Sequence, residues 1–155
     1  AVTVLADKEE IGSVGATGMQ SSFLPYFIED LAAATGVAGR HVLSKSVCLS
    51  ADVNAAFDPI YPEVMVKSNS CQLNYGVCIT KYTGARGKYD TNDASAELGK
   101  VDAGGGGTVA MYIANLNVDT VDLGVPVLSM HAPFEVVSKI DVHMAHRAFS
   151  ALFAR

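Results

Sequence analysis

The stretch from Val2 to Ser13, VTVLADKEEIGS, decides how we interpret this sequence. It joins a run of aliphatic and β-branched residues, typical of a buried strand over Val2–Leu5, to a charged turn. The adjacent carboxylates of Glu9 and Glu10 repel each other, and a divalent cation offsets that cost. Because neighbouring side chains point in different directions, one carboxylate can bind a metal ion while the other acts as a base toward water. A solvated acidic turn is the alternative interpretation of this pair.

Two further polar groups follow predicted strands. Asp52 comes after a strand predicted over His41–Leu49, and His131 comes after short strands predicted over Val121–Leu123 and Val127–Met130. The strand ends of an open α/β sheet meet at one edge, where such sheets bind ligands. Carboxylate oxygens and an imidazole together suit zinc, manganese or cobalt. An aspartate cap and a surface histidine are the alternatives for these two residues taken singly.

The rest of the chain alternates between helical and extended patterns. Helical spacing is present over Phe23–Ala34 and Thr108–Leu116, whereas Val77–Thr80 is typical of a strand. Ser138 is predicted to cap a terminal helix, with Asp141 completing an acidic variant of the capping box. The apolar face of this helix is predicted to hold Ile140, Met144, Ala148, Ala151 and Leu152. This alternation predicts an α/β fold: a three-layer sandwich with a mixed, largely parallel sheet flanked by helices.

Composition narrows the class of protein. The 155 residues are 50% hydrophobic and 17% charged, with a formal net charge of -5, which favours one folded domain over disorder. The sequence shows no basic face for nucleic acid or a membrane surface, and no apolar run of the roughly 20 residues that a membrane helix needs. Cys48, Cys71 and Cys78 form no Cys-x-x-Cys pair. We therefore expect three reduced thiols in a cytoplasmic protein.

Several motifs together resemble the aspartyl aminopeptidase (aminopeptidase I) family of zinc enzymes. They are DKEEIGS at 7–13, SADVNAAFDP at 50–59 and DLGVPVLSMH at 122–131, while KYTGARGK at 81–88 and the glycine run at 104–107 agree with the bacterial members. The resemblance runs in order along nearly the whole chain. It implies a zinc exopeptidase-like fold and a metalloaminopeptidase that removes the N-terminal residue from peptides.

The resemblance also implies a role for each motif residue. Glu9 matches the general base that activates a metal-bound water. Glu10 and His131 match ligands of one zinc ion, and Asp52 matches a ligand of the second, with manganese or cobalt as substitutes. Lys81 and Tyr89 match residues that contact the peptide substrate. For Lys81 and Tyr89, a surface pair on an edge strand is an equally good interpretation.

The chain also departs from the family pattern. The resemblance implies an upstream histidine ligand, a bridging aspartate and a dimerisation domain, all placed before residue 1, and a longer segment near 97–104. We therefore expect residues 1–155 to be the C-terminal part of a catalytic domain, incomplete by itself, whose complete enzyme is a homo-oligomer. His41, His143 and His146 are expected on exposed surfaces, not as ligands.

Two alternatives to this prediction stay open. A catalytically incomplete fragment could act only as an assembly or interaction piece, with exposed apolar surface. A peptide- or sugar-binding module that has lost catalysis is disfavoured, because Glu9, Glu10, Asp52 and His131 are all present.

Overall fold

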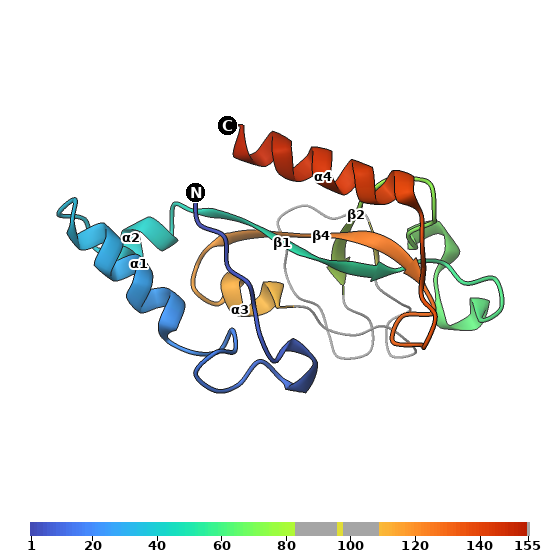
Figure 1. The fold of residues 1–155 in the computed structure, drawn as a ribbon, viewed down its shortest axis with the longest axis horizontal. Coiled ribbons are helices and arrows are strands. Elements are labelled where there is room, and N and C mark those ends of the chain that lie inside the picture. Colours follow the sequence, from blue (N-terminus) through green and yellow to red (C-terminus); the bar gives the residue numbers. More distant parts are fainter. Residues whose placement is uncertain (83–95, 98–108, 155) are drawn as a thin grey trace. The chain divides into compact units, whose positions relative to one another are not determined.

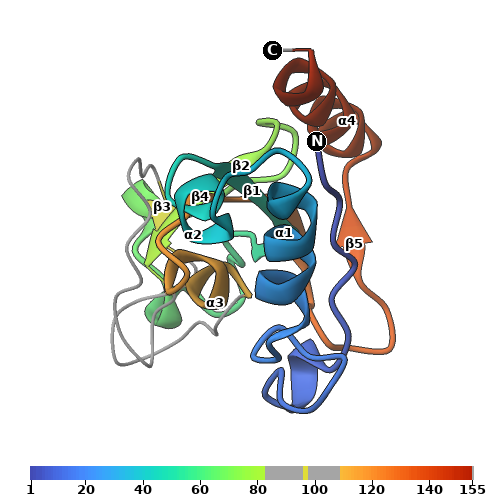
Figure 2. The same cartoon turned by 90° about the vertical axis from the view of Figure 1, so that its left-hand side faces the viewer.

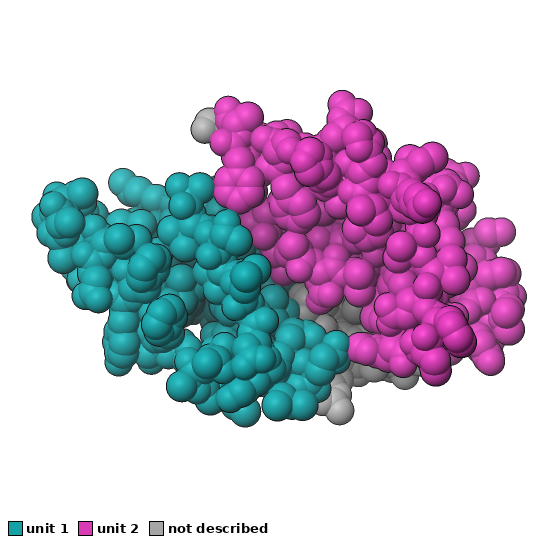
Figure 3. All heavy atoms as spheres, viewed as in Figure 1, with its two compact units in different colours: residues 1–48, 108–120 teal, residues 49–107, 121–155 magenta. Residues whose placement is uncertain are grey.

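The computed structural model describes residues 1–82, 96–97 and 109–154. Two compact units divide the chain (Figure 3). Unit 1 comprises residues 1–48 and 108–120, and unit 2 comprises residues 49–107 and 121–155. In the part of the chain that is described, no helix is long and apolar enough to cross a membrane.

Unit 1 is built mainly from helices. Its helices are α1 (Phe23–Ala33), α2 (Gly39–Leu43), α3 (Ala110–Ala114) and a short 3-10 helix, η1 (Glu9–Ile11). Figure 2 shows α1 and α2 side by side, and Glu29 of α1 accepts a hydrogen bond of 2.6 Å from the backbone N–H of Gly39. The helices predicted over Phe23–Ala34 and Thr108–Leu116 are confirmed as α1 and α3. The first ends as expected, because Gly36 adopts a left-handed φ of 73° three residues past its end.

The sheet is mixed, as predicted. Its strands are β1 (Val47–Ala55), β2 (Cys78–Tyr82), β3 (Ala96–Glu97), β4 (Asp119–Leu128) and β5 (Val136–Val137), in the order β1-β4-β2-β3, with β5 paired to β4. Two short 3-10 helices, η2 (Pro62–Val64) and η3 (Lys67–Asn69), lie between β1 and β2. The β2–β3 pair is parallel, whereas β2–β4 and β4–β5 are antiparallel.

Two hydrogen bonds give the direction of β1 against β4. Asp119 N–H donates to Ser46 O (3.2 Å) and Ala56 N–H donates to Val127 O (2.8 Å), so the two strands run parallel (Figure 1). Parallel and antiparallel neighbours are thus balanced among the described strands. The expected predominance of parallel pairing is wrong for this part of the chain, while the α/β class with a mixed sheet and flanking helices is confirmed. The three-layer arrangement stays a prediction.

Helix α4 (Lys139–Phe153) covers the β1–β4 pair within unit 2 (Figure 1). Ser138 caps it as predicted, because its Oγ accepts the N–H of Ile140 at 3.2 Å. The buried side of the helix differs from the prediction: Asp141 and Ala145 are its buried residues, and Ile140 is 63% exposed. A helical wheel drawn through the apolar residues alone cannot anticipate that the helix buries an aspartate.

Asp141 replaces the expected capping box by a longer-range contact. Its carboxylate accepts the backbone N–H groups of Asn74 and Gly76, each at 2.8 Å, and the residue is wholly buried. The Ser138 hydroxyl also donates to the Asn74 side chain (2.6 Å). These bonds tie the start of α4 to the loop that leads into β2.

Two predicted strands, Val2–Leu5 and most of His41–Leu49, were wrong. Val2–Leu5 forms no ladder within the described residues, and Leu5 is 91% exposed. An aliphatic run provides β propensity, but a strand also needs a partner for its backbone hydrogen bonds. The segment His41–Leu49 instead contains the end of α2, and β1 starts only at Val47.

The strands predicted over Val121–Leu123 and Val127–Met130 are confirmed as extended structure, but they form one continuous strand, β4, which ends at Leu128. It continues through Pro126 because this residue lies where β4 changes its partner from β2 to β5. The N–H that proline lacks is therefore not required by a ladder hydrogen bond.

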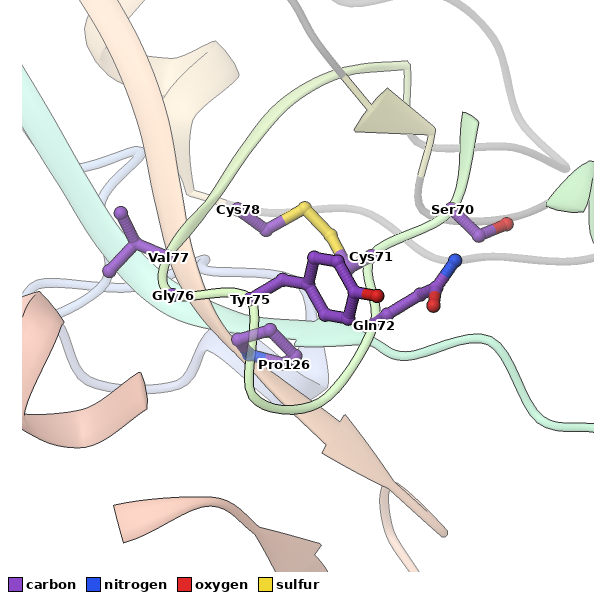
Figure 4. A pocket seen from close by; sticks show the side chains of 8 residues that line it. All are labelled: Ser70, Cys71, Gln72, Tyr75, Gly76, Val77, Cys78 and Pro126. Carbon is purple, nitrogen blue, oxygen red and sulfur yellow. A yellow bond between two sulfur atoms is a disulfide. The ribbon is translucent and has the colours of Figure 1, made fainter. Parts of the chain in front are cut away.

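The structure pairs Cys71 with Cys78 as a disulfide, with the Cα atoms 5.9 Å apart. The prediction of three reduced thiols is therefore wrong for this pair, and Cys48 lies outside the disulfide. The bond closes a short loop whose Tyr75 side chain lines a small pocket together with Pro126 of β4 (Figure 4). Cysteine spacing could not predict the pair, because the fold brings the two ends of the loop together.

Replacing Asp141 with alanine should destabilise the protein by roughly 2–4 kcal/mol, because two backbone donors lose their shared acceptor, a carboxylate on a fully buried residue. Chemical denaturation would measure the change. Asp58→Ala is the matched control, since the Asp58 carboxylate accepts one backbone N–H, that of Ile60, in an exposed turn. A loss for Asp141→Ala no larger than for Asp58→Ala would contradict this assignment.

Candidate functional site

Glu9 and Glu10 lie in a tight turn of unit 1. They open η1, and Lys8 before them adopts a left-handed φ of 62°. The N–H of Ser13 returns to Lys8 O at 2.7 Å, which closes the turn around the two glutamates. Glu9 is half-buried and Glu10 is exposed. The two neighbouring residues therefore differ in solvent exposure.

A second layer of contacts holds this turn in place. Thr17 donates its hydroxyl hydrogen to Asp7 Oδ2 at 2.8 Å, next to the isolated bridge between Asp7 and Gly18. A Cβ at Gly18 would overlap the carbonyl group of Ser13 and would lie 2.9 Å from the next backbone nitrogen. Neither Thr17 nor Gly18 was predicted from the sequence to support the site. No local pattern marks them, because their role is contact with residues several positions away.

Asp52 and His131 lie in unit 2. Asp52 is half-buried in the middle of β1, not beyond its end as predicted, and its Oδ1 accepts the N–H of Val53 at 2.7 Å. His131 follows β4 in an exposed turn closed by the bond from Ala132 N–H to Ser129 O (2.9 Å). The backbone N–H of His131 donates to Glu135 Oε1 at 2.6 Å. The sequence analysis missed Glu135 as the group that holds this turn.

Backbone strain is concentrated in the motifs at 7–13 and 122–131. Lys8, Ser13, Ser129 and His131 all have φ between 57° and 65°, in the left-handed region. The other non-glycine residues with positive φ among those described are asparagines, which tolerate that region. Each left-handed serine or lysine costs on the order of 1–2 kcal/mol, whereas histidine adopts this region more readily, and such strain is often found at functional sites. The chain therefore maintains unfavourable backbone at the segments that present Glu9, Glu10 and His131.

Each unit carries part of the predicted metal site. Glu9 and Glu10 belong to unit 1, whereas Asp52 and His131 belong to unit 2. Across the described residues, no three histidine, cysteine, aspartate or glutamate side chains gather into a cluster able to hold a metal ion. Two carboxylates and one imidazole nevertheless fit zinc by ligand type. The residue types of the prediction thus suit zinc, and both the ligand roles and the assembled site remain predictions.

The remaining predicted residues are only partly covered by the structure. The backbone of Lys81 lies in β2, but its side chain is outside the described part of the chain. Tyr89, the glycine run at 104–107 and residues 98–104 of the expected internal gap also lie outside the described residues. His41, His143 and His146 are exposed, as expected for histidines that are not ligands.

Comparison of the sequence with known proteins identifies the family of this chain. Residues 1–153 match the family described as "Aminopeptidase I zinc metalloprotease (M18)". The sequence is 44% identical to a probable M18 family aminopeptidase 1 from Clostridium acetobutylicum, over 97% of this chain and 37% of that protein. It is 33% identical to aspartyl aminopeptidase 1 of Schizosaccharomyces pombe, over 95% of this chain and 35% of that protein.

Solved structures agree with these sequence matches. The crystal structure of aminopeptidase I from Clostridium acetobutylicum aligns with a TM-score of 0.83 at 44% identity, covering 95% of this chain and 36% of that one. An M18 aminopeptidase from Thermotoga maritima aligns with a TM-score of 0.83 at 38% identity, covering 93% and 38%. The chain thus spans little more than a third of the length of the relatives it matches.

Replacing Thr17 with valine should raise the pKa of Asp7. The Thr17 hydrogen bond is the main cause that holds this pKa below its ordinary value, and a backbone hydrogen bond and the charge of Lys8 act in the same direction. With a lowered pKa, the carboxylate's contribution to the turn is present above the ordinary pKa and is lost as the pH falls through the lowered value. Thr17→Ser, which keeps the hydroxyl, is the control. NMR titration of the Asp7 carboxyl carbon would test this, and identical pKa values in both variants would refute it.

Proposed function

This chain belongs to the aminopeptidase I (M18) family of zinc metalloproteases, and from that premise we propose that it carries catalytic residues of a metalloaminopeptidase. The enzyme would remove the N-terminal residue from peptides by hydrolysis. The observation that carries the proposal is the placement of Glu9, Glu10 and His131 in or beside strained turns, with Asp52 on β1, the strand that pairs with β4. Strain at these motifs is readily explained if the turns serve a site.

Each residue has a distinct role in the proposed reaction. Glu10 and His131 would hold one zinc ion and Asp52 a second, with manganese or cobalt as substitutes. When bound, zinc supplies Lewis acidity toward the scissile carbonyl and lowers the pKa of a bound water. Glu9 would accept the proton of that water on its carboxylate and pass it to the leaving amine. Glu9 is half-buried, so part of its surface is already shielded from bulk water, which supports this role.

The substrate and its recognition follow from the same proposal. The substrates are peptides with a free N-terminus, of acidic or neutral first residue, and the name of the Schizosaccharomyces pombe relative favours an acidic one. Lys81 and Tyr89 would contact the substrate. Neither nucleic acid nor a membrane is a proposed partner.

The assembly and the compartment complete the proposal. Helix α1 presents Phe23, Tyr26 and Leu31 to solvent, at 71%, 69% and 50% exposure, which is the kind of surface that subunit contacts bury. We accordingly propose a homo-oligomer for the complete enzyme. We also propose that the protein is cytoplasmic. The Cys71–Cys78 disulfide would then be an exception, because disulfides are rare in that compartment.

Glu9→Gln in the complete protein should lower kcat by about 10²–10⁴-fold, the usual contribution of a general base, and should leave the bound zinc unchanged. Glu10→Gln should instead lower the zinc content. Assays on peptides with acidic and neutral N-terminal residues, together with zinc analysis of the purified protein, would measure both effects.

Glu63→Gln provides the matched control, since Glu63 lies exposed in η2, away from the motifs. It should behave as wild type in both measurements. A wild-type protein that retains no zinc and hydrolyses no peptide would refute the proposal, as would a Glu9→Gln variant of normal kcat.

A further inference from the structure

One face of β1 carries an unusual row of polar residues on either side of Asp52. Alternate residues of a strand point to the same side, so Ser50, Asp52 and Asn54 share a face. Ser50 is 5% exposed and Asn54 is not exposed at all. All three lie in unit 2. The proposed zinc ligand Asp52 thus lies between two buried polar side chains.

The register of the sheet identifies what lies beside this row. The bond from Ala56 N–H to Val127 O places Asp52 opposite Gly124 in the parallel β1–β4 pair. A Cβ at Gly124 would lie 2.7 Å from Asp52 O and 2.9 Å from the carbonyl carbon of Val53, and would overlap the Asn54 side chain. The missing side chain therefore leaves a gap in β4 that the Asn54 carboxamide fills.

Through this gap, Asn54 reaches the next strand. Its Nδ2 donates a hydrogen bond to Oγ1 of Thr80 in β2, across 26 positions of sequence. Thr80 is 2% exposed, so the bond is shielded from water. The Asn54 Oδ1 has no hydrogen-bond partner within the described part of the chain. The contact with Thr80 is therefore the one that offsets the burial of this amide.

We propose that Asn54 and Thr80 are positioning residues for Asp52. Their hydrogen bond links β1 to β2 across β4 and so fixes the strand position two residues from the ligand. Metal ligands must be held within about 0.5 Å of their productive geometry, and the groups that orient them affect metal affinity by about 10–100-fold when removed. The inference rests on the proposed function, because it assigns the pair to the zinc site of that enzyme.

Thr80→Val in the complete, zinc-loaded protein tests the inference, because valine keeps the shape of threonine and removes the hydroxyl. We expect the zinc dissociation constant, measured by competition with a chelator, to rise by about 10–100-fold. We also expect kcat to fall at a KM near that of wild type, since the pair contacts no substrate. Thr80→Ser keeps the hydroxyl and should restore both values, and Thr80→Cys, a weaker hydrogen-bonding group, should fall between serine and valine.

Thr120→Val is the matched control. Thr120 is also a buried threonine of the same sheet, at 3% exposure, but its hydroxyl donates to Val118 O of its own chain segment (3.0 Å). It should lower the unfolding midpoint without changing zinc affinity. If Thr80→Val binds zinc as wild type does, or if Thr120→Val loses zinc to the same extent, the inference is overturned and the bond is merely structural.

The design separates this inference from the function it rests on. A wild-type protein without zinc binding or peptidase activity would overturn the proposed function and the inference together. An active wild type whose Thr80 and Thr120 variants behave alike would overturn the inference alone. If Thr80→Val does not fold, the comparison of Thr80→Ser with Thr80→Cys still decides, because equal zinc affinity in the two would contradict the proposed dependence on hydrogen bonding.

Discussion

The close approach of β1 to β4 at Gly124 is the constraint on which the centre of unit 2 depends. Any side chain there would overlap the Asn54 amide and press on the backbone of Asp52 and Val53. The strand can approach this closely because a polar group, and not a void, fills the space that glycine leaves. Burial of that amide then requires an acceptor, which Thr80 supplies from β2. One missing side chain thus links three strands and the segment that carries Asp52.

The same unit uses a second buried polar contact on the opposite side of the strands. Asp141 accepts two backbone N–H groups from the loop before β2, and that loop is also closed by the Cys71–Cys78 disulfide. The entrance to β2 is therefore held at Asp141 and its middle at Thr80. With few large apolar side chains fully buried, these directional polar contacts specify the position of β2 more sharply than apolar packing can.

The sequence predicted local structure well and long-range structure poorly. The helix Phe23–Ala33 and the Ser138 cap depend on residues within a few positions of each other, so their patterns were sufficient. Val2–Leu5 has the composition of a strand, but pairing depends on a partner that composition does not specify. Likewise, α4 buries Asp141 because of backbone groups more than 60 positions away, which no helical periodicity reveals.

The candidate site shows the same division between motif and environment. Glu9, Glu10, Asp52 and His131 stood out because their motifs concentrate charge or metal-binding groups in a few residues. Asn54 lies inside one of those motifs, yet it drew no attention, because an asparagine in a strand has no chemical signature of its own. Its role becomes visible only in the folded chain, where its side chain fills the space beside Gly124 and donates a hydrogen bond to Thr80. A motif therefore identifies the residues proposed to meet the substrate or the metal, whereas the residues proposed to orient them become visible only in three dimensions.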